Sequence, residues 1–156
     1  MNNIYSYAMA KDPSLPDTGC EGSGPALERD DGPMCTVLLT TNSEDAGKRA
    51  TLAFSLACTA RSMERPAFVY LAGDGAHWAY AGNEAGIHVS GFPPLGELIR
   101  TFTELGGVVY VCSACDDAYN LMQESKGTPL QRHPGIQQRG LAAALDLLLD
   151  GRTITF

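Results

Sequence analysis

The sequence predicts one α/β domain, a three-layer α/β/α sandwich around a mainly parallel, five-stranded sheet. Two observations lead to this fold class. Short apolar runs rich in β-branched residues recur along the chain, and segments with helical spacing separate them. This alternation is typical of parallel sheets with right-handed crossovers. The chain has 156 residues, 44% of them apolar and 19% charged, a length and composition that suit one folded domain.

Three short apolar runs are expected to form strands that are buried on both faces. They are MCTVLLTT at residues 34–41, PAFVYLA at residues 66–72 and VVYVC at residues 108–112. A fourth strand is indicated only by Ile136, because glycines and prolines interrupt the pattern around it. Residues 153–156 are β-branched and aromatic, which predicts an edge strand.

Helices are expected between these strands. Asn42 or Ser43 can cap the first, which ends before Pro66. Residues 95–105 repeat apolar side chains at helical spacing and precede a Gly-Gly stop. Ser113, with Asp116 three residues later, predicts an N-cap for a helix that begins directly after the third strand. A last helix is expected over residues 141–149; it is apolar around most of its circumference, so something beyond the sheet should cover it.

Charge and composition set the remaining class expectations. The formal net charge is -7, and the first 34 residues hold two basic and six acidic side chains. No basic stripe is visible, which argues against nucleic acid or an anionic membrane as partner. No apolar run is long enough to span a bilayer, and no export signal is visible, so we expect a cytoplasmic protein. Residues 1–33 are acidic and rich in Pro and Gly; we expect a flexible leader, followed by the folded domain at residues 34–156.

Cys112 and Cys115 are the candidate catalytic residues. An odd number of cysteines without an export signal favours free thiols over structural disulfides. Cys112 ends the third strand, beside the free N–H groups of a new helix, which stabilise a thiolate. Cys115 falls in the first turn of that helix, whereas Asp116 and Asp117 place negative charge there and raise a thiol pKa. The helix N–H groups lower the thiol pKa, and the two carboxylates raise it by a similar amount. The sequence therefore leaves the direction of the pKa shift open. The other cysteines are Cys20, Cys35 and Cys58, and the last two are expected to be small core residues.

Further polar residues follow the ends of the predicted strands. Because the carboxyl ends of parallel strands share one edge of a sheet, Asn42, Asp74 and Ser113 should lie on one rim, with His77 close by. We expect these four residues to bind substrate. The chain offers one Cys-x-x-Cys pair without a second, which disfavours structural zinc, and it has neither a nucleophile elbow nor a phosphate-binding glycine motif. No metal or cofactor is expected.

From about residue 36 to residue 156 the chain resembles the DsrE/DsrF-like family, which includes sulfur-relay subunits of the TusD type. The segments that carry the resemblance are VLLTTNSEDAGKRATLAFSLA, FVYLAGDGA, PPLGELIRTFTELGG, VVYVCSAC and LLLDGRTITF. The resemblance implies a flavodoxin-like fold, association into trimers or hexamers, and a transient persulfide on Cys112, with Cys115 as the second cysteine of the pattern. Many relatives carry Arg-Gly where this chain has Tyr119 and Asn120; the change removes a cation, and Asn120 is expected to keep the left-handed helix cap.

These features lead to the hypothesis of a sulfur carrier with sulfurtransferase-like activity. Cys112 takes up sulfane sulfur as a persulfide and relays it between donor and acceptor proteins. Two alternatives stay open. One is a module that binds a small molecule or partner on the same rim without catalysis, and the other is a redox protein that uses a Cys112–Cys115 dithiol.

Overall fold

A single parallel sheet organises the computed structural model, which describes residues 34–127 and 130–156. The expected leader, residues 1–33, lies outside these residues. The strand order is β4-β3-β2-β1-β5, and every neighbouring pair is parallel. The strands are β1 (Cys35–Leu39), β2 (Ala67–Leu71), β3 (Val108–Cys112), β4 (Gln137–Arg139) and β5 (Arg152–Thr155). The predicted fold class is therefore confirmed.

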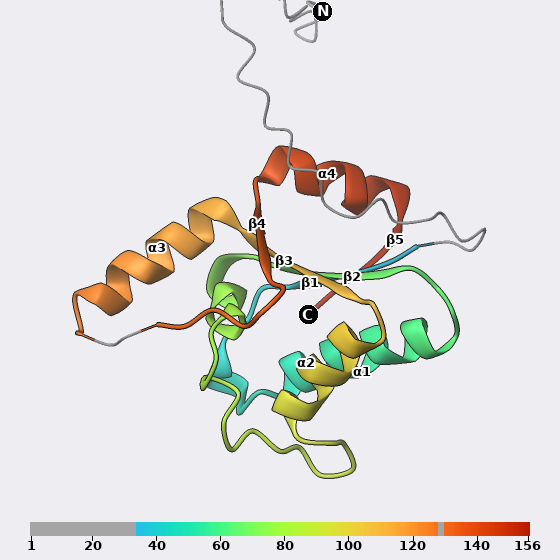
Figure 1. The fold of residues 1–156 in the computed structure, drawn as a ribbon, viewed down its shortest axis with the longest axis horizontal. Helices are drawn as coiled ribbons and strands as arrows, with labels where there is room; N and C mark the ends of the chain where they lie inside the picture. The colour runs from blue at the N-terminus through green and yellow to red at the C-terminus, as the bar shows by residue number, and fades with distance from the viewer. Residues whose placement is uncertain (1–33, 128–129) are drawn as a thin grey trace, which may run out of the picture.

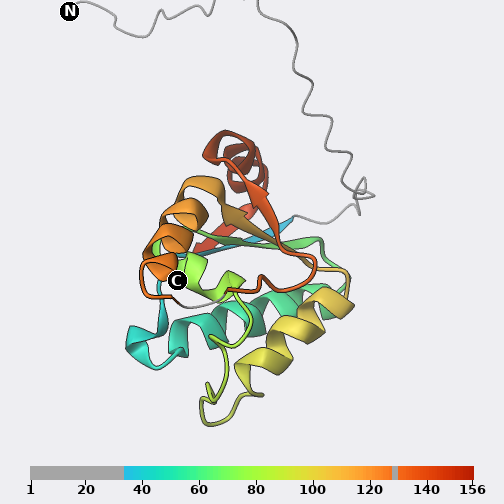
Figure 2. The same cartoon turned by 60° about the vertical axis from the view of Figure 1, so that its left-hand side comes forward.

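Helices cover both faces of the sheet. They are α1 (Lys48–Ser62), α2 (Leu95–Glu104), α3 (Ser113–Glu124) and α4 (Leu141–Asp150), with the 3₁₀ segments η1 (Ser43–Asp45) and η2 (Gly73–Ala79). Figures 1 and 2 show α1 and α2 below the sheet and α4 above it, while α3 extends outward from the end of β3. Phe54 of α1 and Phe102 of α2 meet edge to face in the larger core. A smaller core under α4 contains Tyr70, Tyr110 and Cys112.

The central strands are buried because both of their faces are covered, and this makes their sequences continuously apolar. All five residues of β2 are buried. The edge strands differ: β5 is exposed along its length, and β4 consists of the polar residues Gln137, Gln138 and Arg139. An exposed edge needs few apolar side chains, which explains why β4 left so weak a signal in the sequence.

Three local predictions need correction. Asn42 caps the short segment η1 by accepting from the Glu44 N–H at 2.9 Å, and α1 begins only at Lys48. The N-cap of α3 is Cys112 instead of Ser113. The expected end of this helix near Asn120 is also wrong, because α3 continues to Glu124. Asn120 stays helical where its side chain accepts a hydrogen bond from Tyr80 at 2.8 Å.

The segment η2 follows β2 and closes tightly over the end of β1. No helical segment was predicted for these residues from the sequence. A Cβ at Gly75 would lie 2.1 Å from the Leu39 carbonyl oxygen, so only glycine allows this approach. The buried Trp78 donates from Nε1 to the Thr41 carbonyl at 2.7 Å. These contacts fix η2, and His77 within it, beside the carboxyl ends of β1 and β2.

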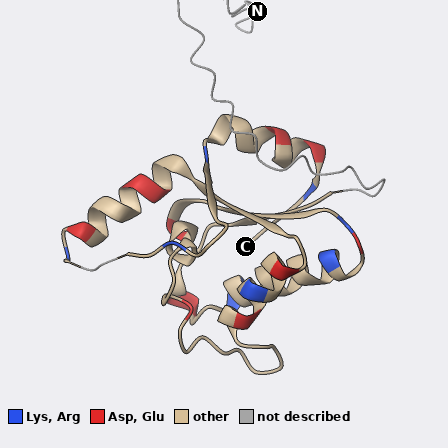
Figure 3. Ribbon diagram, in the orientation of Figure 1, with Lys and Arg blue, Asp and Glu red and all other residues tan. Residues whose placement is uncertain are grey.

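Charged side chains are spread over the described part of the chain. Lys and Arg occupy α1, α2, the edge strands β4 and β5 and several connections, and they do not collect on one face (Figure 3). No helix in this part is both long and apolar enough to cross a membrane.

Candidate functional site

A cavity of about 580 Å³ lies where the chain leaves β1, β2 and β3. Because these strands are adjacent and parallel, the residues that follow them meet at one edge of the sheet. The predicted residues Asn42, Asp74 and His77 line the cavity. The rest of its wall comes from the same strand ends and from one face of α3: Ser43, Gly73, Ala114, Cys115, Ala118, Tyr119, Met122 and Gln123. Ser113, the fourth predicted binding residue, is not among the lining residues in the described part of the chain.

Cys112 lies behind the cavity wall. It is the last residue of β3, and only 2% of it is exposed. Burial raises the pKa of its thiol, but hydrogen bonds to the sulfur outweigh burial and lower the pKa overall. The donors are the backbone N–H and the thiol of Cys115, the Tyr70 hydroxyl and the Ala114 N–H. The first turn of a helix leaves its N–H groups unpaired, so a sulfur at this position finds donors ready.

Cys115 faces the cavity from the first turn of α3. Its sulfur accepts a hydrogen bond from the Gly73 N–H at 3.1 Å. Gly73 has a positive φ of 55°, a conformation that glycine adopts without strain. Burial and the neighbouring Cys112 raise the pKa of Cys115, and they outweigh the Gly73 bond. The two sulfurs thus differ in their surroundings: the pKa of Cys112 is lowered behind the wall, whereas the pKa of Cys115 is raised and its side chain lines the cavity.

Tyr70 was missed by the sequence reasoning. Its hydroxyl donates to the Arg139 carbonyl at 3.0 Å and also lies in hydrogen-bonding contact with Cys112. Burial raises the pKa of Tyr70, so the phenol keeps the proton that it donates. One hydroxyl proton serves two acceptors, and a negative charge on Cys112 makes the sulfur the stronger one. The sequence feature that could have identified Tyr70 is its place within the otherwise apolar run PAFVYLA. A buried tyrosine needs a partner for its hydroxyl.

His77 forms part of the cavity wall as a neutral imidazole. Burial lowers the pKa of His77, and its Nδ1 lies 3.0 Å from the Tyr119 hydroxyl oxygen. That oxygen accepts from the Asn83 amide at 3.1 Å, which leaves the Tyr119 proton free to point at Nδ1. In this arrangement Nε2 of His77 carries the remaining ring proton. His77 therefore contributes an uncharged ring to the wall.

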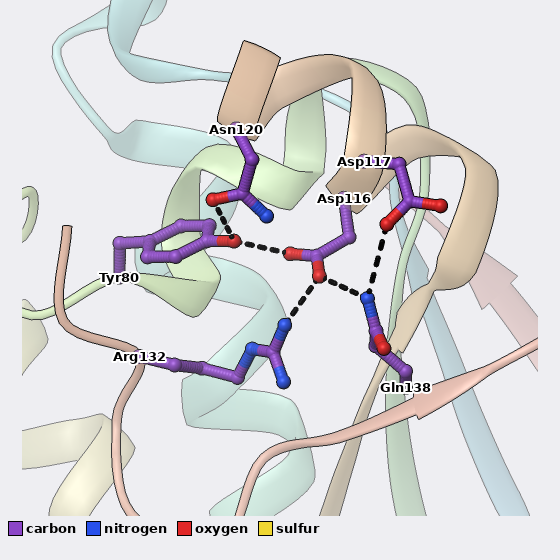
Figure 4. Close-up of polar contacts among 6 residues, drawn as sticks. All are labelled: Tyr80, Asp116, Asp117, Asn120, Arg132 and Gln138. Carbon is purple, nitrogen blue, oxygen red and sulfur yellow. Dashed lines mark hydrogen bonds and ion pairs between the residues drawn. The ribbon is translucent and has the colours of Figure 1, made fainter. Parts of the chain in front are cut away.

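Asp116 anchors α3 from inside the fold (Figure 4). It is fully buried, and its carboxylate accepts from the Tyr80 hydroxyl at 2.6 Å and from Arg132 and Gln138. The sequence assigned this residue to helix capping, which is wrong. Its carboxylate instead accepts hydrogen bonds from Arg132, in the segment that leads into β4, and from Gln138 of β4. An ion pair with Arg132 also offsets the negative charge that Asp116 would otherwise place near Cys112.

The described residues show no group of three or more His, Cys, Asp or Glu side chains that could hold a metal ion. Of the cavity-lining residues, Asp74 is the one with a formal charge at neutral pH, and it is exposed. The cavity wall therefore offers one thiol, one imidazole, amides, hydroxyls and one carboxylate, with the Cys112 thiol behind it.

Comparison with known proteins places these observations in a family. The model of the DsrE/DsrF-like family matches residues 34–156. The YchN protein of E. coli has a similar structure, with a TM-score of 0.61 and 16% sequence identity over 80% of this chain and 98% of its own. A conserved protein of unknown function from Bacteroides thetaiotaomicron is similar over 78% of this chain and 94% of its own, with a TM-score of 0.52 and 12% identity. No curated protein matches the sequence. At these identities the structural likeness establishes the fold alone.

Proposed function

The chain belongs to the DsrE/DsrF-like family, and from this premise we propose that it carries sulfane sulfur as a persulfide on Cys112 and relays it to a partner protein. The observation that supports this most directly is the position of Cys112, buried at the end of β3 and at the N-cap of α3, where hydrogen bonds from Tyr70, Ala114 and Cys115 lower the pKa of its thiol. A thiolate is the form of cysteine that attacks an activated sulfur. The lowered pKa of Cys112 favours this form at neutral pH.

The transfer step needs no cofactor. The Cys112 thiolate attacks the outer sulfur of a donor persulfide, R–S–SH. A new S–S bond forms at Cys112, the bond within the donor breaks, and the donor leaves as the thiolate R–S⁻. A second attack, by an acceptor thiolate on the outer sulfur of the Cys112 persulfide, repeats the exchange and returns Cys112 to its starting state.

Access to Cys112 runs past Cys115. Cys112 is buried, whereas Cys115 lines the cavity in front of it. We propose that the sulfur enters through the cavity and reaches Cys112 when the Cys115 side chain turns aside. Because Asp74 is the one formal charge on the described wall, the site suits a neutral or cationic donor better than an anionic one. Four free thiols in the described residues also fit a reducing compartment such as the cytoplasm.

Intact mass spectrometry tests the carrier proposal. The reduced protein is incubated with cysteine persulfide, and the uptake of one sulfur atom is followed over time. We expect uptake to be lost in Cys112→Ser and kept in Cys58→Ser, a matched control because Cys58 lies in α1 and donates to the Leu98 carbonyl at 3.4 Å. Uptake by Cys112→Ser at the rate of the unaltered chain would show that another residue accepts the sulfur.

A binding module without catalysis is the second candidate. The observation in its favour is the cavity itself, whose wall includes His77 and Tyr119 held in fixed orientation by Asn83. Under this alternative the Cys112 thiol has the ordinary reactivity of a free cysteine and takes up no sulfur. The uptake experiment therefore separates the two candidates.

We also propose that α4 is covered by further copies of the chain, in a trimer or hexamer. Leu141, Leu145 and Leu149 of α4 are 65%, 51% and 73% exposed, and Ala144 is its one buried residue. In light scattering, the full chain and a chain that starts at Gly32 should both have the mass of a trimer or hexamer. We expect Leu145→Glu to dissociate it and Leu121→Glu, an exposed leucine of α3, to leave it intact. A monomer at micromolar concentration would contradict the proposal, and assembly lost only on truncation would place residues 1–31 in the interface.

A further inference from the structure

The two thiols of the site are in contact and face different surroundings. Cys112 is buried and Cys115 lines the cavity, yet both side chains pack in the same small core, and hydrogen bonding between the two sulfurs contributes to the pKa shift of each. Both are free thiols in this structure. They stand three residues apart where β3 passes into α3, a spacing at which two cysteines can form a disulfide. By contrast Cys58, half-buried in α1, bonds only a backbone carbonyl.

We infer that the chain has a second activity, the reduction of sulfane sulfur to sulfide, in which Cys115 resolves the persulfide on Cys112 and a Cys112–Cys115 disulfide forms. The inference rests on the proposed function, since it begins from the loaded Cys112. It gives a sulfur atom two possible fates. An acceptor that reaches the cavity takes the outer sulfur, and in the absence of an acceptor Cys115 discharges it.

The atoms and electrons of the step balance. The Cys115 sulfur attacks the inner sulfur of the Cys112 persulfide anion, Cys112–S–S⁻, and forms the disulfide bond. The bond from that inner sulfur to the outer one breaks, and the outer sulfur leaves with the electron pair. It takes the proton that Cys115 gives up and departs as HS⁻. The outer sulfur gains two electrons, and each cysteine sulfur loses one. A dithiol reductant then restores both thiols by exchange.

The surroundings of the two cysteines favour attack by Cys115 on the Cys112 persulfide over attack by a thiol from solution. Burial shields the inner sulfur of Cys112 from bulk thiols, and Cys115 is the thiol that already touches it. The Gly73 N–H points at the Cys115 sulfur at 3.1 Å and stabilises the negative charge that develops there as its proton leaves. The cavity in front of Cys115 gives the released HS⁻ a path to solvent.

The test loads the full, reduced chain with cysteine persulfide, removes the excess donor, and follows released sulfide together with intact mass. We expect the unaltered chain and Cys58→Ser to release one sulfide for each Cys112–Cys115 disulfide, located by peptide mapping. In Cys115→Ser, and independently in Cys115→Ala, the sulfur should stay on Cys112 and sulfide release should be lost.

Two other outcomes separate the inference from the carrier proposal. If the unaltered chain holds its persulfide without forming a disulfide, or if the Cys115 variants release sulfide as fast as it does, the resolving role of Cys115 is wrong and the carrier proposal stands. If no sulfur reaches Cys112 in the unaltered chain or in either Cys115 variant, the carrier proposal fails and the inference fails with it.

Discussion

The cysteines at the end of β3 and those elsewhere in the core differ in chemistry although burial acts on all of them. Burial raises the pKa of Cys35 at the start of β1, where Arg65 offsets it only in part, and it raises the pKa of Cys58 within α1. Cys112 is more buried than either residue, yet its pKa is lowered. Burial alone therefore does not set the direction of the pKa shift of these thiols; the hydrogen-bond donors around the sulfur reverse it at Cys112.

The source of those donors is the junction between a strand and a helix. Inside α1 the backbone N–H groups bond carbonyls of the preceding turn, so none is left for the Cys58 sulfur. At the start of α3 the N–H groups of Ala114 and Cys115 have no such partners and bond Cys112 instead. The placement of a cysteine relative to a helix start thus matters more than its depth in the protein.

The largest expected effect comes from removing the anchor of α3. Asp116→Ala should lower the free energy of unfolding by about 3 kcal/mol or more, because Arg132 is left without its buried partner and Tyr80 and Gln138 lose their acceptor. Denaturant unfolding measures the change. The matched control is Asp117→Ala: this residue is exposed and makes one long contact, 3.4 Å to Gln138, so we expect a change within about 0.5 kcal/mol.

The Asp116→Ala variant also tests whether the lowered pKa of Cys112, compared with that of Cys58, depends on the hydrogen bonds that Asp116 makes from α3. If Asp116→Ala remains folded, the α3 start should loosen and the alkylation rate of Cys112 at neutral pH should fall toward that of Cys58. Equal losses of stability in the Asp116 and Asp117 variants would show that the buried ion pair does not anchor the helix.

Much of the fold could be predicted from the sequence because the central strands are buried on both faces and so are continuously apolar. The runs at β1, β2 and β3 were found for this reason, and so was α2 with its amphipathic spacing. Prediction failed where contacts between segments far apart in the sequence, and not local sequence patterns, determine the structure. The segment η2 depends on how closely Gly75 approaches β1, and α3 continues past Asn120, whose side chain bonds Tyr80 instead of ending the helix.

The sequence predicted several residues that line the cavity, but it did not predict which cysteine is buried and which faces the cavity. Strand ends that share one edge brought Asn42, Asp74 and His77 together around one cavity. Which cysteine faces that cavity depends on the direction of the last side chain of β3, which a spacing pattern does not contain. Tyr70 and Arg132 were missed because they reach the site from segments whose partners are known only once the strands are ordered.

A smaller effect should follow from removing one donor to Cys112. Tyr70→Phe deletes the hydroxyl that donates to the sulfur, so we expect the pKa of Cys112 to rise by about one unit, the size of a hydrogen bond to a charged group. The rate of alkylation with iodoacetamide, measured against pH, reports this value. Because the pKa of Cys112 is lowered in the unaltered chain, its alkylation should persist to lower pH than in the variant.

Tyr110→Phe is the matched control for Tyr70→Phe. Tyr110 lies in the same small core, stacks on Phe68 and is not among the donors to Cys112. Its pH profile should overlay that of the unaltered chain. Identical profiles for all three proteins would mean that the donors from Ala114 and Cys115 stabilise the thiolate without Tyr70.

The smallest effect is expected at Cys58. Burial raises the pKa of this thiol, so it stays protonated at neutral pH, and its hydrogen bond to the Leu98 carbonyl is long, 3.4 Å. A serine hydroxyl can keep a hydrogen bond to the same carbonyl with a slight shift, and the position is only half-buried. We expect Cys58→Ser to change the free energy of unfolding by less than about 1 kcal/mol and to leave the pH profile of alkylation unchanged. If alkylation at neutral pH is lost in Cys58→Ser and kept in Cys112→Ser, the alkylated residue is Cys58, and the contrast between the two regions would be reversed.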